Sequence, residues 1–154
     1  MQAAVLPKKE QETAPAAKNR VCFVCTGNTC RSPMAAALYN HLYAKEGKSA
    51  FSAGLFASFG EPIHENAKKA LALAGIPNTK TNNYEAHFAH TLSKADMQAA
   101  DLVFAITPSH AMQILGRFPE FASKITVLGD IADPFGGDLD DYLATLEKIK
   151  EALA

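Results

Sequence analysis

The feature that most constrains this chain is a short apolar stretch at residues 21–24, followed at once by a loop of small polar residues and a proline-marked helix start. The stretch reads VCFV, which is typical of a fully buried central strand. The loop at residues 25–31 reads CTGNTCR, and Ser32 followed by Pro33 predicts a helix N-cap and a first helical residue. This strand–loop–helix unit places the loop beyond the carboxyl end of a strand, where open α/β sheets bind their ligands.

The same alternation of strand and helix patterns continues to the end of the chain. Four short buried strands that alternate with helices predict an α/β fold, in which a four-stranded parallel sheet is flanked by helices on both faces. We expect the remaining strands at residues 49–53, 102–106 and 125–128, and helices at 32–47, 63–74, 93–100, 108–115 and 138–153.

Length and charge restrict the class of protein. A chain of 154 residues suits one domain with a single core. Residues 1–19 are rich in Ala, Lys, Glu, Gln and Pro and are predicted to form a flexible tail before a single domain at 20–154. A net charge of −1 offers no basic surface for nucleic acid, and no apolar run is long enough to cross a membrane. The chain also begins without the pattern of a secretory signal, so we expect a cytoplasmic protein.

Three cysteines lie within nine residues, which is a poor framework for structural disulfides. Cys22 belongs to the apolar strand and is predicted to be a core residue. No second cysteine pair completes a zinc site, so neither a metal nor another cofactor is expected. Cys30 either fills space in the loop or forms a reversible disulfide with Cys25, and both interpretations stay open.

The loop after the first strand contains what phosphoryl transfer through a covalent intermediate requires. Cys25 is the candidate nucleophile, because a helix N-terminus and a nearby cation both favour a thiolate. Arg31 presents a planar fork of donors that matches two phosphate oxygens. Gly27 and its small neighbours allow successive backbone N–H groups to surround an anion. The hydroxyl of Ser32 is predicted to donate to the sulfur of Cys25.

A proton donor for the leaving group is expected in the loop after the last strand, because that loop returns to the same edge of the sheet. Asp133 and Asp130 are the two candidates. Asp133 is preferred, since Pro134 stiffens the chain after it and Phe135 is placed to line a substrate slot. The same carboxylate could then activate the water that hydrolyses a phosphocysteine.

Together, residues 24–35 (VCTGNTCRSPMA) and residues 133–137 (DPFGG) resemble the low-molecular-weight protein phosphatase family. The resemblance covers residues 20–154 and also includes Ser52-Ala53-Gly54 and residues 100–103. It implies a two-step, metal-independent reaction on phosphorylated proteins. By this resemblance the catalytic residues are Cys25, Arg31 and Asp133, and the substrate-binding residues are Thr26, Gly27, Asn28, Thr29, Cys30, Ser32 and Phe135.

Two positions bear on the substrate. Tyrosine-specific members of the family usually carry a bulky aliphatic residue in place of Thr29, and the combination of Thr29 with the Asp133-Pro134-Phe135 acid loop resembles bacterial protein-arginine phosphatases. A hydroxyl can hydrogen-bond a phosphoguanidinium, whereas an aliphatic side chain cannot. Phosphoarginine is therefore the predicted substrate and phosphotyrosine the alternative. A non-catalytic phosphate-binding or redox-sensing module is the alternative of a different class, and a monomer is favoured.

The five histidines do not form a pattern with chemistry of its own. His87 and His90 have a spacing that metal sites use, but the sequence near them contains no cysteine and no acidic residue other than Glu85. They are therefore predicted to be solvated loop residues. His41, His64 and His110 fall on predicted helices or loop ends and are assigned no role.

Overall fold

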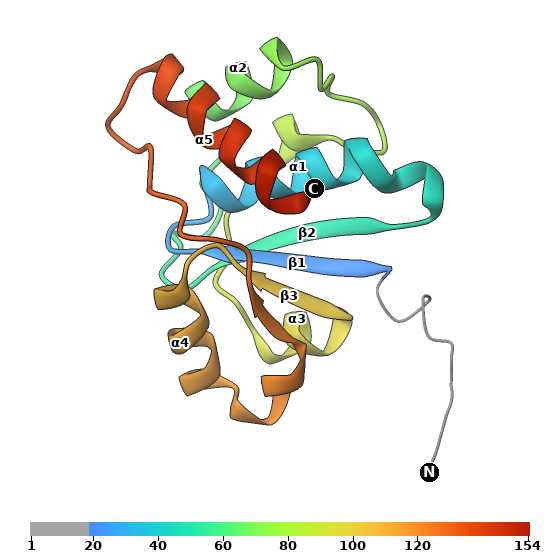
Figure 1. Cartoon of the computed structure of the whole chain (residues 1–154), viewed down its shortest axis with the longest axis vertical. Helices are drawn as coiled ribbons and strands as arrows, with labels where there is room; N and C mark the ends of the chain where they lie inside the picture. Colours follow the sequence, from blue (N-terminus) through green and yellow to red (C-terminus); the bar gives the residue numbers. More distant parts are fainter. Residues whose placement is uncertain (1–18) are drawn as a thin grey trace.

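The computed structural model describes residues 19–154. Its strands form one four-stranded parallel sheet in the order β2-β1-β3-β4, which confirms the expected fold class (Figure 1). The predicted tail, except for Asn19, lies outside the described residues. The strands are β1 (Arg20–Cys25), β2 (Ser49–Gly54), β3 (Leu102–Ala105) and β4 (Ile125–Val127).

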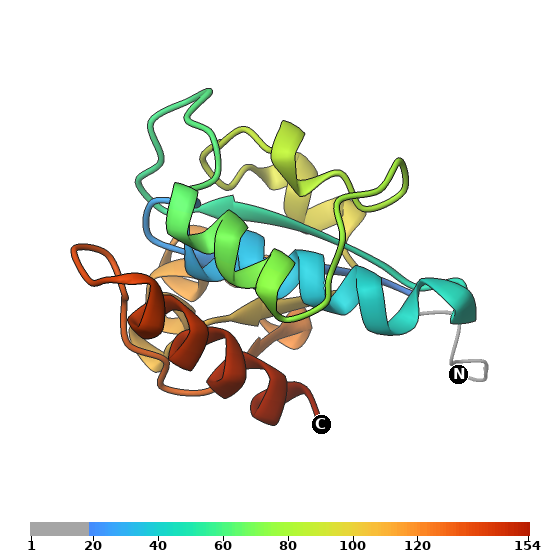
Figure 2. The same ribbon diagram turned by 90° about the horizontal axis from the view of Figure 1, so that it is seen from above.

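Helices cover both faces of this sheet. Helices α1, α2 and α5 lie together over one face, and α3 and α4 lie under the other (Figures 1 and 2). Three 3₁₀ turns, η2 (Ala44–Glu46), η3 (Tyr84–Ala86) and η4 (Pro119–Lys124), complete the connections. The helices are α1 (Arg31–Tyr43), α2 (Glu65–Leu73), α3 (Lys94–Ala99), α4 (Pro108–Arg117) and α5 (Leu139–Leu153).

Strand β1 lies between β2 and β3 and is buried on both faces. Val21 and Phe23 pack into the core under α1 and α5, whereas Cys22 and Val24 pack into the core on the opposite face. Because successive side chains of a strand point to opposite faces, a central strand needs apolar residues at every position. Cys22 is fully buried, as predicted.

The start of α1 differs from the prediction. The helix begins at Arg31 with Cys30 as its N-cap residue, and no side chain caps it. Ser32 is therefore not the N-cap; its hydroxyl faces the sulfur of Cys25 instead. Pro33 lies in the first turn, where backbone N–H groups have no helical acceptor, so its missing N–H costs nothing.

The carboxyl ends of the parallel strands meet at one edge, where the loops after β1, β2 and β4 converge (Figure 1). Backbone bonds tie the first two loops together: Leu55 N–H donates to Cys25 O, and Phe56 N–H donates to Thr26 O, both at 2.9 Å. Gly54 makes this approach feasible, because a Cβ there would lie 2.6 Å from the carbonyl oxygen of Thr26. In the described part of the chain, no helix has the length and apolarity of a membrane span.

Candidate active site

Cys25 is the last residue of β1 and is almost fully buried at the bottom of the site. Its Sγ lies 2.9 Å from Oγ of Ser32, in the first turn of α1. Ser32 Oγ also accepts a hydrogen bond from Nδ2 of Asn28 at 2.8 Å. The Ser32 hydroxyl proton is then available to the sulfur or, at the longer distance of 3.5 Å, to the carbonyl of Ala53; donating it to the sulfur stabilises a thiolate.

Asn28 fixes the shape of the loop that follows Cys25. Its backbone is left-handed at φ 60, a conformation that asparagine tolerates better than most residues, and it is completely buried. Its Nδ2 donates to Ser32 and, at 3.0 Å, to Oγ of Ser52 on β2. Its Oδ1 accepts the backbone N–H of His90 at 3.2 Å. One buried amide side chain thus joins the loop to α1, β2 and the segment before α3.

His87 and His90 lie in a loop, as predicted, but they are half-buried and each ring has a hydrogen-bond partner, so they are not simply solvated. His87 Nε2 donates to the backbone carbonyl of Asn28 at 2.7 Å, and burial lowers the pKa of His87. His90 Nε2 lies 3.0 Å from Oδ2 of Asp96. The partner of each ring is set by how a distant loop packs, and the spacing of the two histidines carries no signal for it.

Arg31 is buried beside the loop, and its guanidinium is held in place. Nη1 donates to the backbone carbonyl of Ile131 at 2.9 Å, and Nη2 lies 3.6 Å from Oδ2 of Asp133. These contacts bring the candidate phosphate-binding arginine and the candidate acid together, although 102 positions separate them in the sequence. Of the two aspartates considered, Asp133 lies in the site and Asp130 does not.

The site is a cavity of about 250 Å³ at the carboxyl edge of the sheet. Asp133 is exposed at its mouth, and its Oδ1 accepts the backbone N–H of Phe135 at 3.1 Å. Ser32 is the one predicted site residue that does not line the cavity, because it lies behind Cys25. Glu61, from the loop after β2, was not predicted. The lining residues are Cys25, Thr26, Gly27, Asn28, Thr29, Cys30, Arg31, Glu61, Asp133 and Phe135.

Cys30 faces the interior under α5. Its Sγ lies 3.4 Å from the hydroxyl of Tyr142, which is completely buried and stacks on the ring of His64. Burial raises the pKa of Cys30, so its thiol stays protonated at neutral pH. Both Cys25 and Cys30 are reduced here, and a reversible disulfide between them stays a prediction.

His110 and His64, to which the sequence assigned no role, also contact the loop after β1. Nε2 of His110 lies 3.0 Å from Oγ1 of Thr26, and the backbone N–H of His64 donates to the carbonyl of Thr29 at 2.9 Å. Neither contact has a local sequence signal, since His110 on α4 and His64 at the start of α2 lie far along the chain from Thr26 and Thr29.

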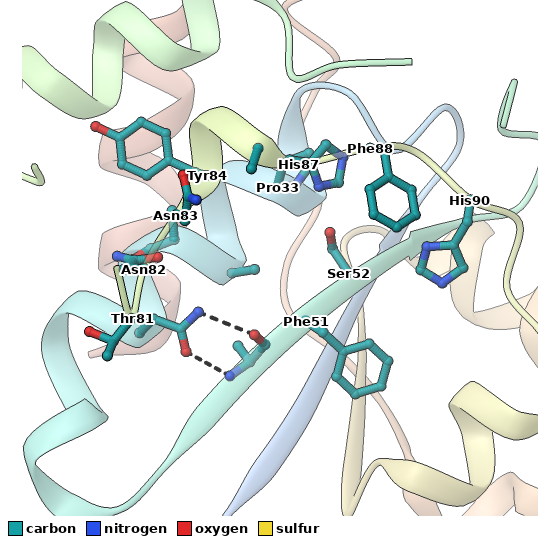
Figure 3. A pocket seen from close by; sticks show the side chains of 15 residues that line it. Pro33, Phe51, Ser52, Thr81, Asn82, Asn83, Tyr84, His87, Phe88 and His90 are labelled. Atoms are coloured by element: carbon teal, nitrogen blue, oxygen red, sulfur yellow. Dashed lines mark hydrogen bonds between the residues drawn. The ribbon is translucent and has the colours of Figure 1, made fainter. Parts of the chain in front are cut away.

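A second cavity, of about 280 Å³, lies behind the loop, between α1, β2 and residues 81–90. Ser52, His87 and His90 point into this space and also hold Asn28 (Figure 3). Ser52 is buried and holds Asn28 through its hydroxyl, His87 is half-buried and holds it through its ring, and His90 holds it through its backbone N–H. In residues 19–154, no three His, Cys, Asp or Glu side chains gather as a metal site requires.

One small cavity thus holds a thiol beside a hydroxyl, an arginine fork and a carboxylate. Such a set of groups can accept a phosphoryl group on sulfur. Comparison with known proteins gives the family. Residues 20–154 match the model of the low molecular weight phosphotyrosine protein phosphatase family. The chain therefore belongs to this family of phosphatases.

Individual relatives agree with this assignment. A protein-arginine-phosphatase of Geobacillus stearothermophilus is 40% identical over 139 residues, covering 85% of this chain and 88% of the relative. The low molecular weight protein-tyrosine-phosphatase PtpB of Staphylococcus haemolyticus is 32% identical over 136 residues, covering 84% and 91%. A solved structure of a serine mutant of YwlE arginine phosphatase, with its active-site serine phosphorylated, superposes with a TM-score of 0.77 at 37% identity, covering 87% of this chain and 90% of that one.

Proposed function

We propose that this protein is a cysteine-dependent protein phosphatase that acts through a phosphocysteine intermediate and prefers phosphoarginine. The observation that carries the proposal is the convergence of Cys25, Arg31 and Asp133 on one cavity, with Ser32 Oγ 2.9 Å from the sulfur. Phosphorylated proteins are its proposed partners. We further propose that it works in the cytoplasm as a monomer and needs neither metal nor nucleic acid.

In the first step, the Cys25 thiolate attacks phosphorus and an S–P bond forms. The P–N bond of phosphoarginine, or the P–O bond of phosphotyrosine, breaks at the same time. Asp133 gives its proton to the departing nitrogen or oxygen, which avoids the release of a strongly basic group. Arg31 and the backbone N–H groups of the loop bind the three equatorial phosphate oxygens and stabilise their charge.

In the second step, Asp133, now a carboxylate, accepts a proton from a water molecule that attacks the phosphocysteine. The S–P bond breaks, inorganic phosphate leaves, and Cys25 returns as the thiolate. The Ser32 hydroxyl donates to the sulfur at the beginning and at the end of the cycle, when its charge is greatest.

Two features of the cavity favour phosphoarginine over phosphotyrosine. Thr29 places a hydroxyl in the wall, and Asp133 with Glu61 places two carboxylates around the mouth. Both suit a cationic guanidinium rich in N–H groups better than an apolar phenyl ring. The protein-arginine-phosphatase at 40% identity supports the same preference.

A direct comparison of kcat/KM on phosphoarginine and phosphotyrosine peptides of matched sequence tests the proposal. We expect faster phosphate release from phosphoarginine. A higher value on phosphotyrosine would replace phosphoarginine with the alternative substrate. Thr29→Ile should shift the ratio of the two kcat/KM values toward phosphotyrosine. An unchanged ratio would show that Thr29 does not discriminate between the two substrates.

Generic aryl phosphate hydrolysis separates an enzyme from a non-catalytic phosphate-binding or redox-sensing module. The reduced wild type should hydrolyse the ester, and Cys25→Ser should show no detectable turnover because a hydroxyl at this position lacks the thiolate's nucleophilicity. Binding of inorganic phosphate without hydrolysis by the fresh, reduced wild type would favour the binding module.

A further inference from the structure

Thr26 is the cavity-wall residue directly after the nucleophile, and a buried histidine holds its hydroxyl. Oγ1 of Thr26 lies 3.0 Å from Nε2 of His110, which is only 4% exposed on α4. The other ring nitrogen, Nδ1, lies 3.0 Å from Oγ1 of Thr107, the N-cap residue of α4. Three side chains thus connect the wall of the site to the helix under the opposite face of the sheet.

Thr26 lines the cavity, and its hydrogen bond to His110 leaves an unused lone pair on Oγ1. Burial, reinforced by the charge of Arg31, lowers the pKa of His110 to about 4, so the ring is neutral at neutral pH. If Nε2 carries the proton, it donates a hydrogen bond to Thr26 Oγ1, which keeps a second lone pair. If Nδ1 carries the proton, the Thr26 hydroxyl donates a hydrogen bond to Nε2, and both lone pairs of Oγ1 remain available. In either tautomer the oxygen of Thr26 is fixed and free to accept.

We propose that Thr26 is a specificity-determining residue for the phosphorylated guanidinium, and that His110 is the residue that positions it. An N–H group of the substrate's guanidinium donates to Thr26 Oγ1 while the loop holds its phosphoryl group. A phenyl ring offers no donor and would leave this oxygen without a partner. The inference rests on the proposed preference for phosphoarginine and adds a second hydroxyl to that of Thr29.

Thr26→Val tests the role of the hydroxyl, because valine keeps the shape of threonine and removes its oxygen. The readout is the ratio of kcat/KM on phosphoarginine to kcat/KM on phosphotyrosine peptides, which cancels any loss of folded protein. Removing one hydrogen bond to a charged group should lower this ratio about tenfold. An unchanged ratio would overturn the role of Thr26.

His110→Ala tests positioning, because it leaves the Thr26 hydroxyl free to rotate or to bind water. The ratio should fall in the same direction, and His110→Gln should recover part of it, since its amide can donate to Thr26 Oγ1. In the double variant with Thr26→Val, the ratio should be no lower than in Thr26→Val alone, because both changes remove one interaction. If the fall in the ratio in the double variant equals the product of the falls in the two single variants, the coupling between His110 and Thr26 is contradicted.

Ser109→Ala is the matched control for α4. Ser109 precedes His110, is exposed, and its Oγ accepts only from Nε2 of Gln113 at 3.3 Å, so the ratio should stay at the wild-type value. If the wild type itself fails on phosphoarginine, the proposed function fails together with this inference. If the wild type prefers phosphoarginine and Thr26→Val has the same ratio as the wild type, the inference alone fails.

Discussion

The loop that follows β1 and the acid loop that follows β4 meet at one cavity but are held in very different ways. Asn28, in the first loop, is completely buried and makes hydrogen bonds to residues of α1, β2 and the segment before α3. Asp133, in the second loop, has a half-exposed side chain with one bond to a near neighbour and a 3.6 Å contact with Arg31. The loop proposed to bind phosphate is thus pre-organised, and the loop proposed to supply the proton is open to solvent.

This difference predicts separable defects. Changes in the β1 loop should alter stability and the handling of every substrate, because buried hydrogen bonds set its geometry. Changes in the acid loop should leave the fold intact and affect substrates according to how much their leaving group needs a proton.

Asp133→Ala should give the largest effect. Loss of the general acid should lower kcat by roughly 10²–10⁴-fold on phosphate esters with poor leaving groups, and by less on activated aryl esters. Because the carboxylate is half-exposed, the free energy of unfolding should change by only about 0.5 kcal/mol. Turnover across a leaving-group series and a denaturant titration measure the two quantities.

Asp130→Ala is the control for this loop, since Asp130 is exposed and outside the cavity. Its leaving-group dependence should match that of the wild type. A loss in Asp130→Ala that follows leaving-group basicity, with little change in Asp133→Ala, would exchange the roles of the two aspartates.

Asn28→Ala should show the opposite pattern. It removes three buried hydrogen bonds and puts alanine in a left-handed conformation, so we expect roughly 3 kcal/mol of lost stability. The kcat on good and poor leaving groups should fall by a similar factor, because positioning rather than protonation is damaged. Stability close to that of the wild type would show that the buried amide does not hold the loop.

His110 should make stability depend on pH. Its pKa is about 4 in the folded protein and near 6.5 in the unfolded chain, so between these values the unfolded chain binds more protons. Stability should therefore fall as pH drops from 6.5 to 4, by on the order of 3 kcal/mol from this residue. In His110→Gln the unfolding free energy should vary less over this range, and identical slopes would contradict a neutral buried ring.

Substitution of Cys30 should have the smallest effect on the activity of the reduced enzyme, but a clear effect on its activity after treatment with peroxide. If Cys30 forms a disulfide with Cys25, wild-type activity should return on adding a dithiol, whereas Cys30→Ser should recover several-fold less because the nucleophile passes to irreversible oxidation states. Cys22→Ala is the control, since Cys22 is buried in the opposite core. Equal recovery in Cys30→Ser and the wild type would remove the protective role.

The catalytic loop and the acid were predictable because their signals are local. A buried strand, a loop of small residues and a proline-marked helix start specify where Cys25 and Arg31 lie, and the loop after the last strand of a parallel sheet must return to the same edge. The exact helix start was not predicted correctly: Ser32 was expected both to cap the helix and to contact the sulfur of Cys25, and only the contact with the sulfur is present, because the helix begins at Arg31, one residue before Ser32.

The sequence by itself determined the parallel sheet, the order of its elements along the chain and the meeting of Cys25, Arg31 and Asp133 at one edge, because those signals come from local patterns and from the direction of parallel strands. Only the tertiary structure decided what surrounds them. Asn28, His87 and His110 each have a partner that lies 59 to 84 positions away, and no local pattern encodes such contacts. The proposed preference for phosphoarginine depends on those contacts, since they orient groups that line the cavity.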